Sequence, residues 1–516
     1  MGYKIPVTGS GPIGGWLRRL ALAAGLLLLA ACSSLQPVDL PPEYTPAPAR
    51  APIWETLEAD RPGEWYVLLN DGTAALDWRL RAIDSATESI DLQTFLWSFD
   101  IVGALVLDHL VVAAERGVQV RLLVDDTFLL GEDQVLLEIA HHPNIEYRIF
   151  NPYKRRTSGF ATRQALNAGE FHRLDHRMHN KAMVIDNRVA IVGGRNIADE
   201  YFGLHGEANF RDLELLAGGP IVARVSTSFD AYWNDQWSFP VESMSHVRSA
   251  PADLDAARSV RDQHVHLHAE ETEQARLARW REVVAAAVSG SGTLYADEPP
   301  RDNPAKQAEA PIQVANALIG MFDSATDEVV IVSAYLIPTP ELAGAVKRAV
   351  ERGVRIRMLT NSIRSNNHLT AHSAYRNHIK ELLSNGAELH EVRIDAHDRH
   401  IYMLSPIGGK ALALHAKALV IDDDRVFIGS ANLDPRSLRI NTEMGLEVES
   451  KALNARLREA VAPDFDRSNA WQLQFDEEGN VIWVSDNATL TSQPAMSVMQ
   501  RIEDWFFAHL PLEGEL

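Results

Sequence analysis

The chain contains the same succession of sequence markers twice, and this duplication constrains its fold more than any other feature. Asp84-Ser85-Ala86-Thr87 returns at residues 323–326, and Glu115-Arg116-Gly117-Val118 returns at residues 351–354. In each copy an apolar, strand-like run follows the first marker, and a helical pattern ends at the second, whose glycine suits a helix C-cap. This strand–helix–strand order predicts an α/β fold in which a β-sheet flanked by helices is built twice, as two related halves.

The N-terminus has the layout of a secretory signal. Arg18 and Arg19 precede twelve apolar residues, 20–31, and then Cys32, the one cysteine of the chain. Twelve residues of helix rise only about 18 Å, which is too short to span a bilayer. Leu29-Ala30-Ala31-Cys32 resembles a bacterial lipobox, which implies cleavage before Cys32 and lipidation of its thiol. We therefore expect a lipoprotein of the bacterial cell envelope, anchored to the inner or outer membrane and facing the periplasm. The alternatives are a plain signal peptide with a coincidental cysteine and a buried N-terminal helix.

Changes in composition divide the chain into five expected segments. These are a signal peptide at 1–31, a Pro/Ala-rich tether at 32–60, a first half at 61–245, a connecting helix and linker at 246–310, and a second half with a C-terminal extension at 311–516. The linker contains three alternating histidines, which on a strand would share one face and could bind a metal: His264, His266 and His268. Because no thiol or carboxylate is specified beside them, we expect a solvent-exposed triplet and no metal site.

One cluster of polar residues occurs in both halves at the same spacing. The first copy comprises His179, Lys181, Asp186 and Gly193-Gly194-Arg195-Asn196, and the second comprises His415, Lys417, Asp422 and Gly429-Ser430-Ala431-Asn432. Each His and its Lys are two residues apart beside a strand-like run, so they share one face. The glycines turn the chain so that the asparagine and backbone amides can face the same pocket. Two copies in register indicate a shared function rather than coincidence.

This set of side chains suits a phosphodiester. Lys181, Lys417, Asn196 and Asn432 can hold the non-bridging oxygens and stabilise a five-coordinate phosphorus without a metal ion or other cofactor. One neutral imidazole can attack phosphorus, while a second, protonated imidazole donates a proton to the departing oxygen. With an unperturbed pKa of about 6.5, imidazole can take either role near neutral pH, and the residues alone leave open which histidine attacks.

The two cassettes resemble the signature of the phospholipase D superfamily, His-x-Lys-x4-Asp-x6-Gly-Ser/Gly-x-Asn, with Gly194 where serine is commoner. The resemblance covers nearly all of residues 61–516. It implies halves related by a pseudo-twofold axis, with both His–Lys pairs in one cleft between them. It also implies a phosphohistidine, usually on the N-terminal histidine, here His179, with His415 as acid and then base. The signature's catalytic set is His179, Lys181, Asp186, His415, Lys417 and Asp422.

Carboxylates are expected to orient the two imidazoles, as in catalytic triads. Glu443 precedes an apolar strand in the second half, and Asp212 holds the corresponding place in the first half. Asp186 and Asp422 stand at an odd spacing from their lysines and so face away from them. Although both acids belong to the signature, we therefore expect them to stabilise the neighbouring loop and strand and not to take part in the chemistry.

Net charge and further resemblances narrow the substrate. The chain has 49 basic and 70 acidic residues, a net charge of −21, which repels nucleic acid as a partner. Residues 429–445 resemble those of bacterial cardiolipin synthases, and residues 229–234 and 510–513 are most similar to the C-type subgroup. The resemblance implies a phosphatidyl transferase that makes cardiolipin from phosphatidylglycerol, with phosphatidylethanolamine or a second phosphatidylglycerol as phosphatidyl donor.

Two other functions stay open, together with the need for an accessory protein. One is a phosphodiesterase of the phospholipase D type, acting on phospholipids or, less readily, on nucleic acid. It would differ from a synthase only in letting water attack the phosphohistidine. The other is a lipid-binding lipoprotein without catalysis, which the intact cassettes disfavour. The basic segment 154–177 is a candidate contact for an anionic headgroup, with a solvated loop as the alternative.

Overall fold

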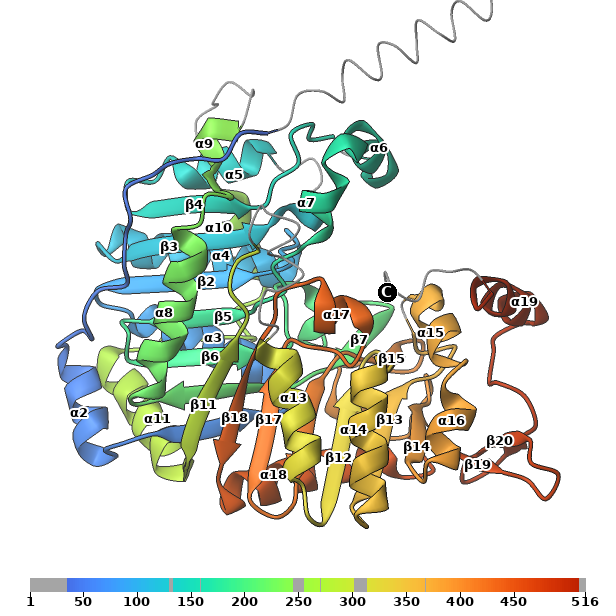
Figure 1. The fold of residues 1–516 in the computed structure, drawn as a ribbon. Helices are drawn as coiled ribbons and strands as arrows, with labels where there is room; N and C mark the ends of the chain where they lie inside the picture. Colours follow the sequence, from blue (N-terminus) through green and yellow to red (C-terminus); the bar gives the residue numbers. More distant parts are fainter. Residues whose placement is uncertain are drawn as a thin grey trace, which may run out of the picture.

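The computed structural model describes residues 35–129, 133–157, 159–244, 255–269, 271–300, 313–366 and 368–509. Within them, each half of the chain is a large mixed sheet with helices packed on it, and the two sheets lie against each other (Figure 1). This architecture confirms the duplicated α/β fold predicted from the repeat.

Strand order shows the duplication directly. The first sheet runs β10 (Val288–Ser289), β1 (Trp65–Leu69), β8 (Glu214–Gly218), β6 (Val189–Gly193), β5 (Ala182–Ile185), β2 (Ser89–Thr94), β3 (Gln119–Asp125), β4 (Ile145–Phe150), β9 (Ser238–Pro240). The second runs β11 (Ser291–Ala296), β18 (Met444–Glu449), β17 (Arg425–Gly429), β16 (Lys417–Ile421), β12 (Glu328–Ser333), β13 (Arg355–Asn361), β14 (Glu388–Val392), β19 (Ala470–Phe475), β20 (Val481–Val484), β21 (Thr489–Leu490). From β1 and β11 onward, eight strands correspond one to one. In both sheets the three strands after the first marker are parallel and their neighbours antiparallel.

The helices also follow the repeat. The first half contains α3 (Gly72–Ser85), α4 (Ile101–Glu115), α5 (Asp133–Ala140), α6 (Phe160–Leu166), α7 (Phe171–Asp175), α8 (Ile221–Trp233) and α9 (Val241–Met244). The second contains α13 (Gln313–Ser324), α14 (Pro340–Glu351), α15 (Leu369–Tyr375), α16 (Ile379–Ser384), α17 (Pro435–Arg439), α18 (Lys451–Val461) and α19 (Val498–Phe507). The glycines of the second marker, Gly117 and Gly353, follow α4 and α14 with φ of +98° and +91°, as expected for a left-handed C-cap.

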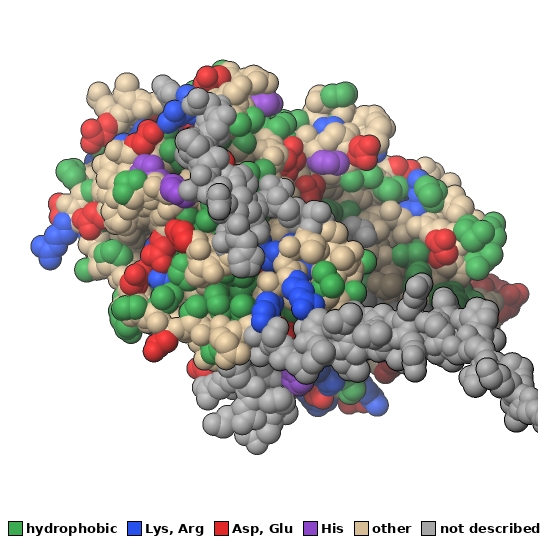
Figure 2. All heavy atoms as spheres, turned by 90° about the horizontal axis from the view of Figure 1, so that it is seen from above, with side chains coloured by type: hydrophobic (Ala, Val, Ile, Leu, Met, Phe, Trp, Pro, Cys, Tyr) green, Lys and Arg blue, Asp and Glu red, His purple; other side chains and the backbone are tan. Residues whose placement is uncertain are grey.

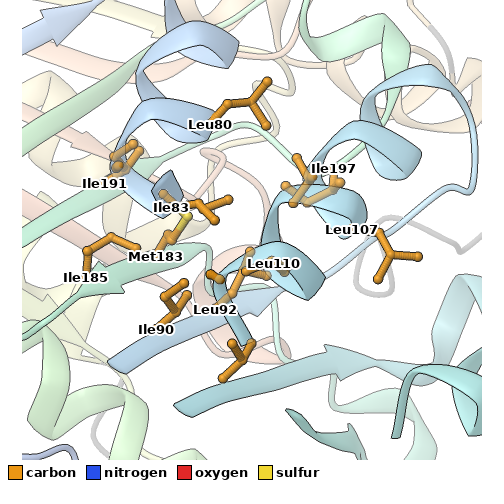
Figure 3. Close-up of a cluster of buried hydrophobic side chains, with 14 of the residues drawn as sticks. Leu80, Ile83, Ile90, Leu92, Leu107, Leu110, Met183, Ile185, Ile191 and Ile197 are labelled. Carbon is orange, nitrogen blue, oxygen red and sulfur yellow. The ribbon is translucent and has the colours of Figure 1, made fainter. Parts of the chain in front are cut away.

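Each half has its own core, and a further cluster joins the two sheets. In the first half, Leu80 and Ile83 of α3 and Leu110 of α4 pack with Ile90 and Leu92 of β2 (Figure 3). The joining cluster brings side chains of both sheets together, among them Val184, Val192 and Leu215 from the first and Val420, Ile428 and Leu446 from the second. Burial of one such side chain stabilises a fold by about 1.5–3 kcal/mol, so the shared cluster holds the halves as one unit.

Residues 35–60 do not form the tether that their Pro/Ala content predicts. The segment runs along the first half and ends in α2 (Pro52–Asp60) (Figure 1, blue). Ala49 and Trp54 are only 1% and 2% exposed, and the backbone N–H of Thr45 donates to Asp230. Proline-rich backbone is extended whether or not it packs, so composition alone does not reveal the docking. The expected signal peptide and Cys32 lie outside the described residues, among which no helix has the length and apolar character of a membrane span.

Residues 288–296, expected within a surface linker, are strands of both sheets. β10 pairs with β1 and β11 pairs with β18, and Gly290 alone separates the two strands. Before them, α10 (Asp255–Gln263) packs on α4, and α11 (Glu273–Ala286), the expected connecting helix, buries Trp280 against Trp54. The crossing between the halves is therefore hydrogen-bonded into both sheets.

Candidate active site

Two short backbone pairings between the halves build the centre of the site. In the first, β7 (Ala208–Arg211) and β15 (Ala411–Leu414) form a parallel two-stranded sheet. Asp212 follows β7 and His415 follows β15, so the pairing sets a carboxylate beside an imidazole. His415 Nδ1 lies 2.7 Å from Asp212 Oδ2, and the backbone N–H of His415 donates to the carbonyl of Arg211 at 2.9 Å.

The second pairing is the counterpart of the first. Met178 and Thr442 form a parallel bridge, and the residues that follow them are His179 and Glu443. The Nδ1 of His179 lies 3.0 and 2.9 Å from the two carboxylate oxygens of Glu443. Each histidine is therefore held by a carboxylate of the opposite half. The sequence indicates both carboxylates, but this crossed pairing depends on how the halves dock.

The two lysines are buried within the same cluster. Lys181 Nζ donates to the carbonyl of His179 at 2.7 Å, and Lys417 Nζ donates to that of His415. Burial lowers the pKa of Lys181 to about 7 and that of Lys417 to about 8, although the nearby carboxylates partly offset it. Burial and the lysine charges also lower the pKa of His179 well below its usual value and that of His415 to about 3. Both imidazoles are therefore neutral at pH 7, beside two lysines that can contact an anionic phosphate.

The two carboxylates differ in their charge state. Burial raises the pKa of Glu443 to about 7 despite the neighbouring lysines and a hydrogen bond from Ser430. Burial alone would raise the pKa of Asp212 too, but His415 and Lys417 together lower it to about 2. Asp212 is thus fully ionised at neutral pH, and a protonated imidazole at His415 would gain more from its partner than one at His179.

The carboxylate pairing explains why the first cassette has Gly194 where the second has Ser430. A Cβ at Gly194 would lie 2.2 Å from Asp212 Oδ1, so the carboxylate of Asp212 already fills the place of a serine side chain. In the second cassette the Ser430 hydroxyl donates to Glu443 at 2.5 Å and accepts from the N–H of Met444 at 3.0 Å. Ser430 therefore helps to hold the carboxylate of Glu443 against His179.

The two asparagines predicted to bind phosphate are placed differently. Asn196 Nδ2 donates to the hydroxyl of Tyr201 at 2.8 Å, and Asn196 Oδ1 accepts from the N–H of Leu96 at 3.2 Å. Asn432 is 4% exposed, and its Oδ1 accepts no hydrogen bond from the described residues. Tyr201, which sequence reasoning missed, lies edge-on to His415 with ring centroids 4.9 Å apart. A tyrosine in a loop gives no sequence signal of this contact.

Asp186 and Asp422, the remaining acids of the signature, bind the turn before the first parallel strand of each half. Asp186 accepts from the N–H groups of Thr87, Glu88 and Ser89, from the Thr87 hydroxyl and from the indole of Trp54. Asp422 accepts in the same way from the backbone of residues 326–328. Each acid therefore holds the turn that begins with the threonine of the first marker and leads into the first parallel strand.

We expect Asp186→Ala to destabilise the fold by about 3–5 kcal/mol, because it leaves buried donors without an acceptor. Chemical denaturation of the variant measures this loss. Asp423→Ala removes an exposed acid paired with Lys451 and should cost less than about 0.5 kcal/mol. A stable Asp186→Ala variant that had lost turnover would instead place Asp186 in the chemistry.

The histidine triplet of the linker is not the solvent-exposed group that was expected, because His268 is buried. Its side chain is 4% exposed, with Nδ1 2.8 Å from Asp77 Oδ1 and Nε2 3.1 Å from Asp84 Oδ2. Ligand atoms of Asp84, His109 and His268 lie within 4.8 Å of one another. Both ring nitrogens of His268 nevertheless face carboxylates, which is the pattern of an imidazolium ion. The three histidines follow helix α10 and do not lie on a strand, so their alternation in the sequence does not place them on one face.

His268 should make the stability of the linker contact depend on pH. Burial alone would lower its pKa, but the bonds to Asp77 and Asp84 raise it to about 9. A raised folded-state pKa means that this stabilisation is complete below about pH 6.5 and is lost as pH rises through about 9. We expect the melting temperature of the parent protein to exceed that of His268→Gln clearly at pH 6 and much less at pH 10. An equal difference in melting temperature at pH 6 and pH 10 would show that His268 is not an imidazolium ion in the folded protein.

Comparison with known proteins identifies the family. The family model described as "Cardiolipin synthase, PLD-like domain" matches residues 80–233 and 318–464, one segment in each half. The chain belongs to this family. It is 34% identical to cardiolipin synthase C of Escherichia coli over 454 residues, which cover 84% of this chain and 92% of that protein. It is 26% identical to cardiolipin synthase B of Escherichia coli over 409 residues, 77% of this chain and 80% of that protein.

A solved structure shares the fold of this phospholipase D-like enzyme. Phosphatidylserine synthase of Haemophilus influenzae superimposes with a TM-score of 0.52 at 15% identity, covering 81% of this chain and 92% of that one. Together with the family match, the relatives confirm the resemblance seen in the cassettes. The protein is an enzyme of the phospholipase D superfamily that modifies phospholipids.

A pocket of about 310 Å³ adjoins the site of this enzyme. It is lined by Phe95, whose ring centroid lies 4.8 Å from that of His179, and by Arg436 of the second half. The basic segment 154–177 contributes Phe160, Phe171 and Arg177 to the lining of this pocket.

Proposed function

We propose that this enzyme is a phosphatidyl transferase that makes cardiolipin from phosphatidylglycerol, through a phosphohistidine on His179. Phosphatidylethanolamine or a second phosphatidylglycerol is the donor. The crossed pairing carries the proposal, because each imidazole is held through Nδ1 by a carboxylate of the opposite half and keeps Nε2 for the reaction. The similarity to cardiolipin synthases supports the substrate class.

In the first step, His179 Nε2 attacks the phosphorus of the donor. The bond from phosphorus to the headgroup oxygen breaks, and His415 gives that oxygen a proton, so ethanolamine or glycerol leaves as a neutral hydroxyl. Lys181 and Lys417 neutralise the phosphate oxygens, and no metal ion is needed in this scheme. The anionic phosphate offsets the lysine charges that depress the pKa of His415, and ionised Asp212 stabilises the imidazolium, so substrate binding brings the acid into its protonated form.

In the second step, His415 takes the proton of a glycerol hydroxyl of phosphatidylglycerol as that oxygen attacks phosphorus. The phosphorus–nitrogen bond breaks, His179 is released and cardiolipin forms. The side chains of His179 and His415 are 11% and 10% exposed, which favours a positioned alcohol over bulk water. Arg177 and Arg436 in the adjoining pocket suit the phosphate of the acceptor lipid.

Product analysis tests the proposal. The protein is incubated with labelled phosphatidylglycerol, with and without phosphatidylethanolamine, and the lipids are separated. We expect labelled cardiolipin from the parent protein and none from His179→Asn. A larger yield in the presence of phosphatidylethanolamine would identify phosphatidylethanolamine as the better donor. Phosphatidic acid as the sole labelled product would identify a hydrolase instead.

We also propose that a lipid on Cys32 anchors the mature enzyme to a membrane of the bacterial envelope, with the site facing the periplasm. The lipobox-like run before Cys32 supports this proposal. Cys32→Ala should keep turnover of detergent-dispersed substrate but abolish labelling of the protein by a radioactive fatty acid. Unchanged fatty-acid labelling of the variant would contradict the anchor.

A further inference from the structure

Helix α19, at the far end of the second half, presents an apolar face to solvent. Five apolar side chains of the helix are more than half exposed: Val498, Met499, Ile502, Trp505 and Phe506. Their spacing of one, three and four residues places them on one side of the helix. Seen from above, hydrophobic side chains stand out at the right-hand end of the molecule, where α19 is found in Figure 1 (Figure 2).

The opposite, polar side of α19 is fixed to the protein. Asp504 is fully buried; its carboxylate accepts from Arg376 at 2.7 Å and from Ser373 at 2.9 Å, and lies 2.8 Å from His372 Nδ1. Gln500, on the same side, donates to the carbonyl of Ile363 at 3.0 Å. A surface helix of a globular protein normally turns its apolar stripe inward. In α19 the polar side is bound inward and the apolar stripe faces out.

A second exposed apolar surface adjoins the active-site pocket, whose lining includes Phe160 and Phe171. Phe128, Phe160 and Phe171 are 40%, 46% and 59% exposed. Ring contacts connect this surface to the catalytic centre: His179 to Phe95 at 4.8 Å, Phe95 to Phe128 at 5.5 Å, and Phe128 to Phe160 at 6.4 Å between centroids. An apolar path thus leads from His179 to the surface at α6. In Figure 1, α6 projects from the first half at the upper right, and α19 projects from the second half at the right-hand edge of the molecule.

We propose that α19, together with the aromatic surface at α6 and α7, docks on a phospholipid bilayer and inserts its apolar side chains into the interface. The choice of occupant rests on the proposed function, since a lipid substrate must reach His179 from a bilayer. The apolar path then lets acyl chains stay covered while the headgroup enters the site. Tryptophan and phenylalanine on an amphipathic helix are the side chains that the interfacial region prefers.

The chain's cysteine content allows a local test of this docking. Cys32→Ala leaves no cysteine, so adding Met499→Cys gives one thiol on α19 for an environment-sensitive fluorophore. The matched control carries the fluorophore at Val265→Cys, an exposed position outside α19. On adding vesicles of equal phosphatidylglycerol and phosphatidylethanolamine, we expect a blue shift at position 499 and quenching by lipid-embedded quenchers, with neither at position 265. A label at 499 that stays water-exposed while the protein sediments with vesicles would overturn the proposal. So would a vesicle-independent shift that grows with protein concentration, because it would identify a second copy of the chain as the occupant.

A functional readout separates this inference from the proposed activity. The triple variant Ile502→Ser, Trp505→Ser, Phe506→Ser should turn over a short-chain phosphatidylglycerol, dispersed as monomers, at the parent rate. On vesicles this variant should be at least tenfold slower than the parent protein. The control triple variant alters three apolar side chains elsewhere and should keep the parent rate on vesicles: Tyr44→Ser, Val265→Ser, Phe475→Ser. Equal rates of both triple variants on vesicles would contradict the docking. Absence of turnover by the parent protein on any lipid would refute the proposed function, and the fluorophore experiment would still decide the docking.

Discussion

Replacing His179 or His415 with asparagine is expected to lower kcat at least about 10⁴-fold, because attack on phosphorus and protonation of a poor alkoxide leaving group are both required. The backbone hydrogen bonds from His179 to Thr442 and from His415 to Arg211 do not depend on the imidazole side chains, so the folds should remain intact. Steady-state rates of cardiolipin formation measure the loss. His397→Asn, at an exposed position, is the control and should keep the parent rate.

The two histidine variants should differ with an activated donor. A donor whose leaving group needs no proton should restore the first step in His415→Asn, where the nucleophile is present, but not in His179→Asn. Release of the leaving group is followed directly. Rescue of His179→Asn instead would reverse the assignment of nucleophile and acid.

Glu443→Gln is expected to lower kcat about 10²- to 10⁴-fold with little change in KM. The carboxylate accepts a hydrogen bond from His179 Nδ1–H and so fixes the tautomer in which Nε2 carries the lone pair. An amide can instead donate its N–H to Nδ1, which favours the opposite tautomer. Glu447→Gln, in the strand β18 that follows Glu443 but hydrogen-bonded to Tyr295, is the matched control. A Glu443→Gln enzyme within threefold of the parent kcat would show that Glu443 does not orient the nucleophile.

Much of this architecture was predictable from the two sequence markers. The sequence Asp84-Ser85-Ala86-Thr87 and the helix end at Gly117, which a left-handed glycine sets locally, both return 236 to 239 residues later. Local patterns of this kind predict each half, its strands and the cassette. The roles of Glu443 and Asp212 as partners of histidine also follow from their place before a strand.

Other features depend on contacts between distant segments. The pairing of His179 with Glu443 and of His415 with Asp212 arises from the bridge at Met178 and the β7–β15 sheet, which exist only once the halves are docked. The strands on either side of Gly290 form because two sheet edges accept them, although the segment reads as a linker. Burial of His268 likewise depends on carboxylates of α3, which lies some 190 residues away.

The central claim, phosphatidyl transfer through His179, is tested most directly by trapping the intermediate. The enzyme is mixed with phosphatidylethanolamine labelled at phosphorus and quenched within milliseconds in alkaline denaturant, because a phosphorus–nitrogen bond is unstable in acid. Peptide mapping then locates the label. The crossed-pair mechanism predicts label on the peptide that contains His179, greater accumulation in His415→Asn with an activated donor, and transfer to cardiolipin when phosphatidylglycerol is added. Turnover to cardiolipin with no label on either histidine would contradict it.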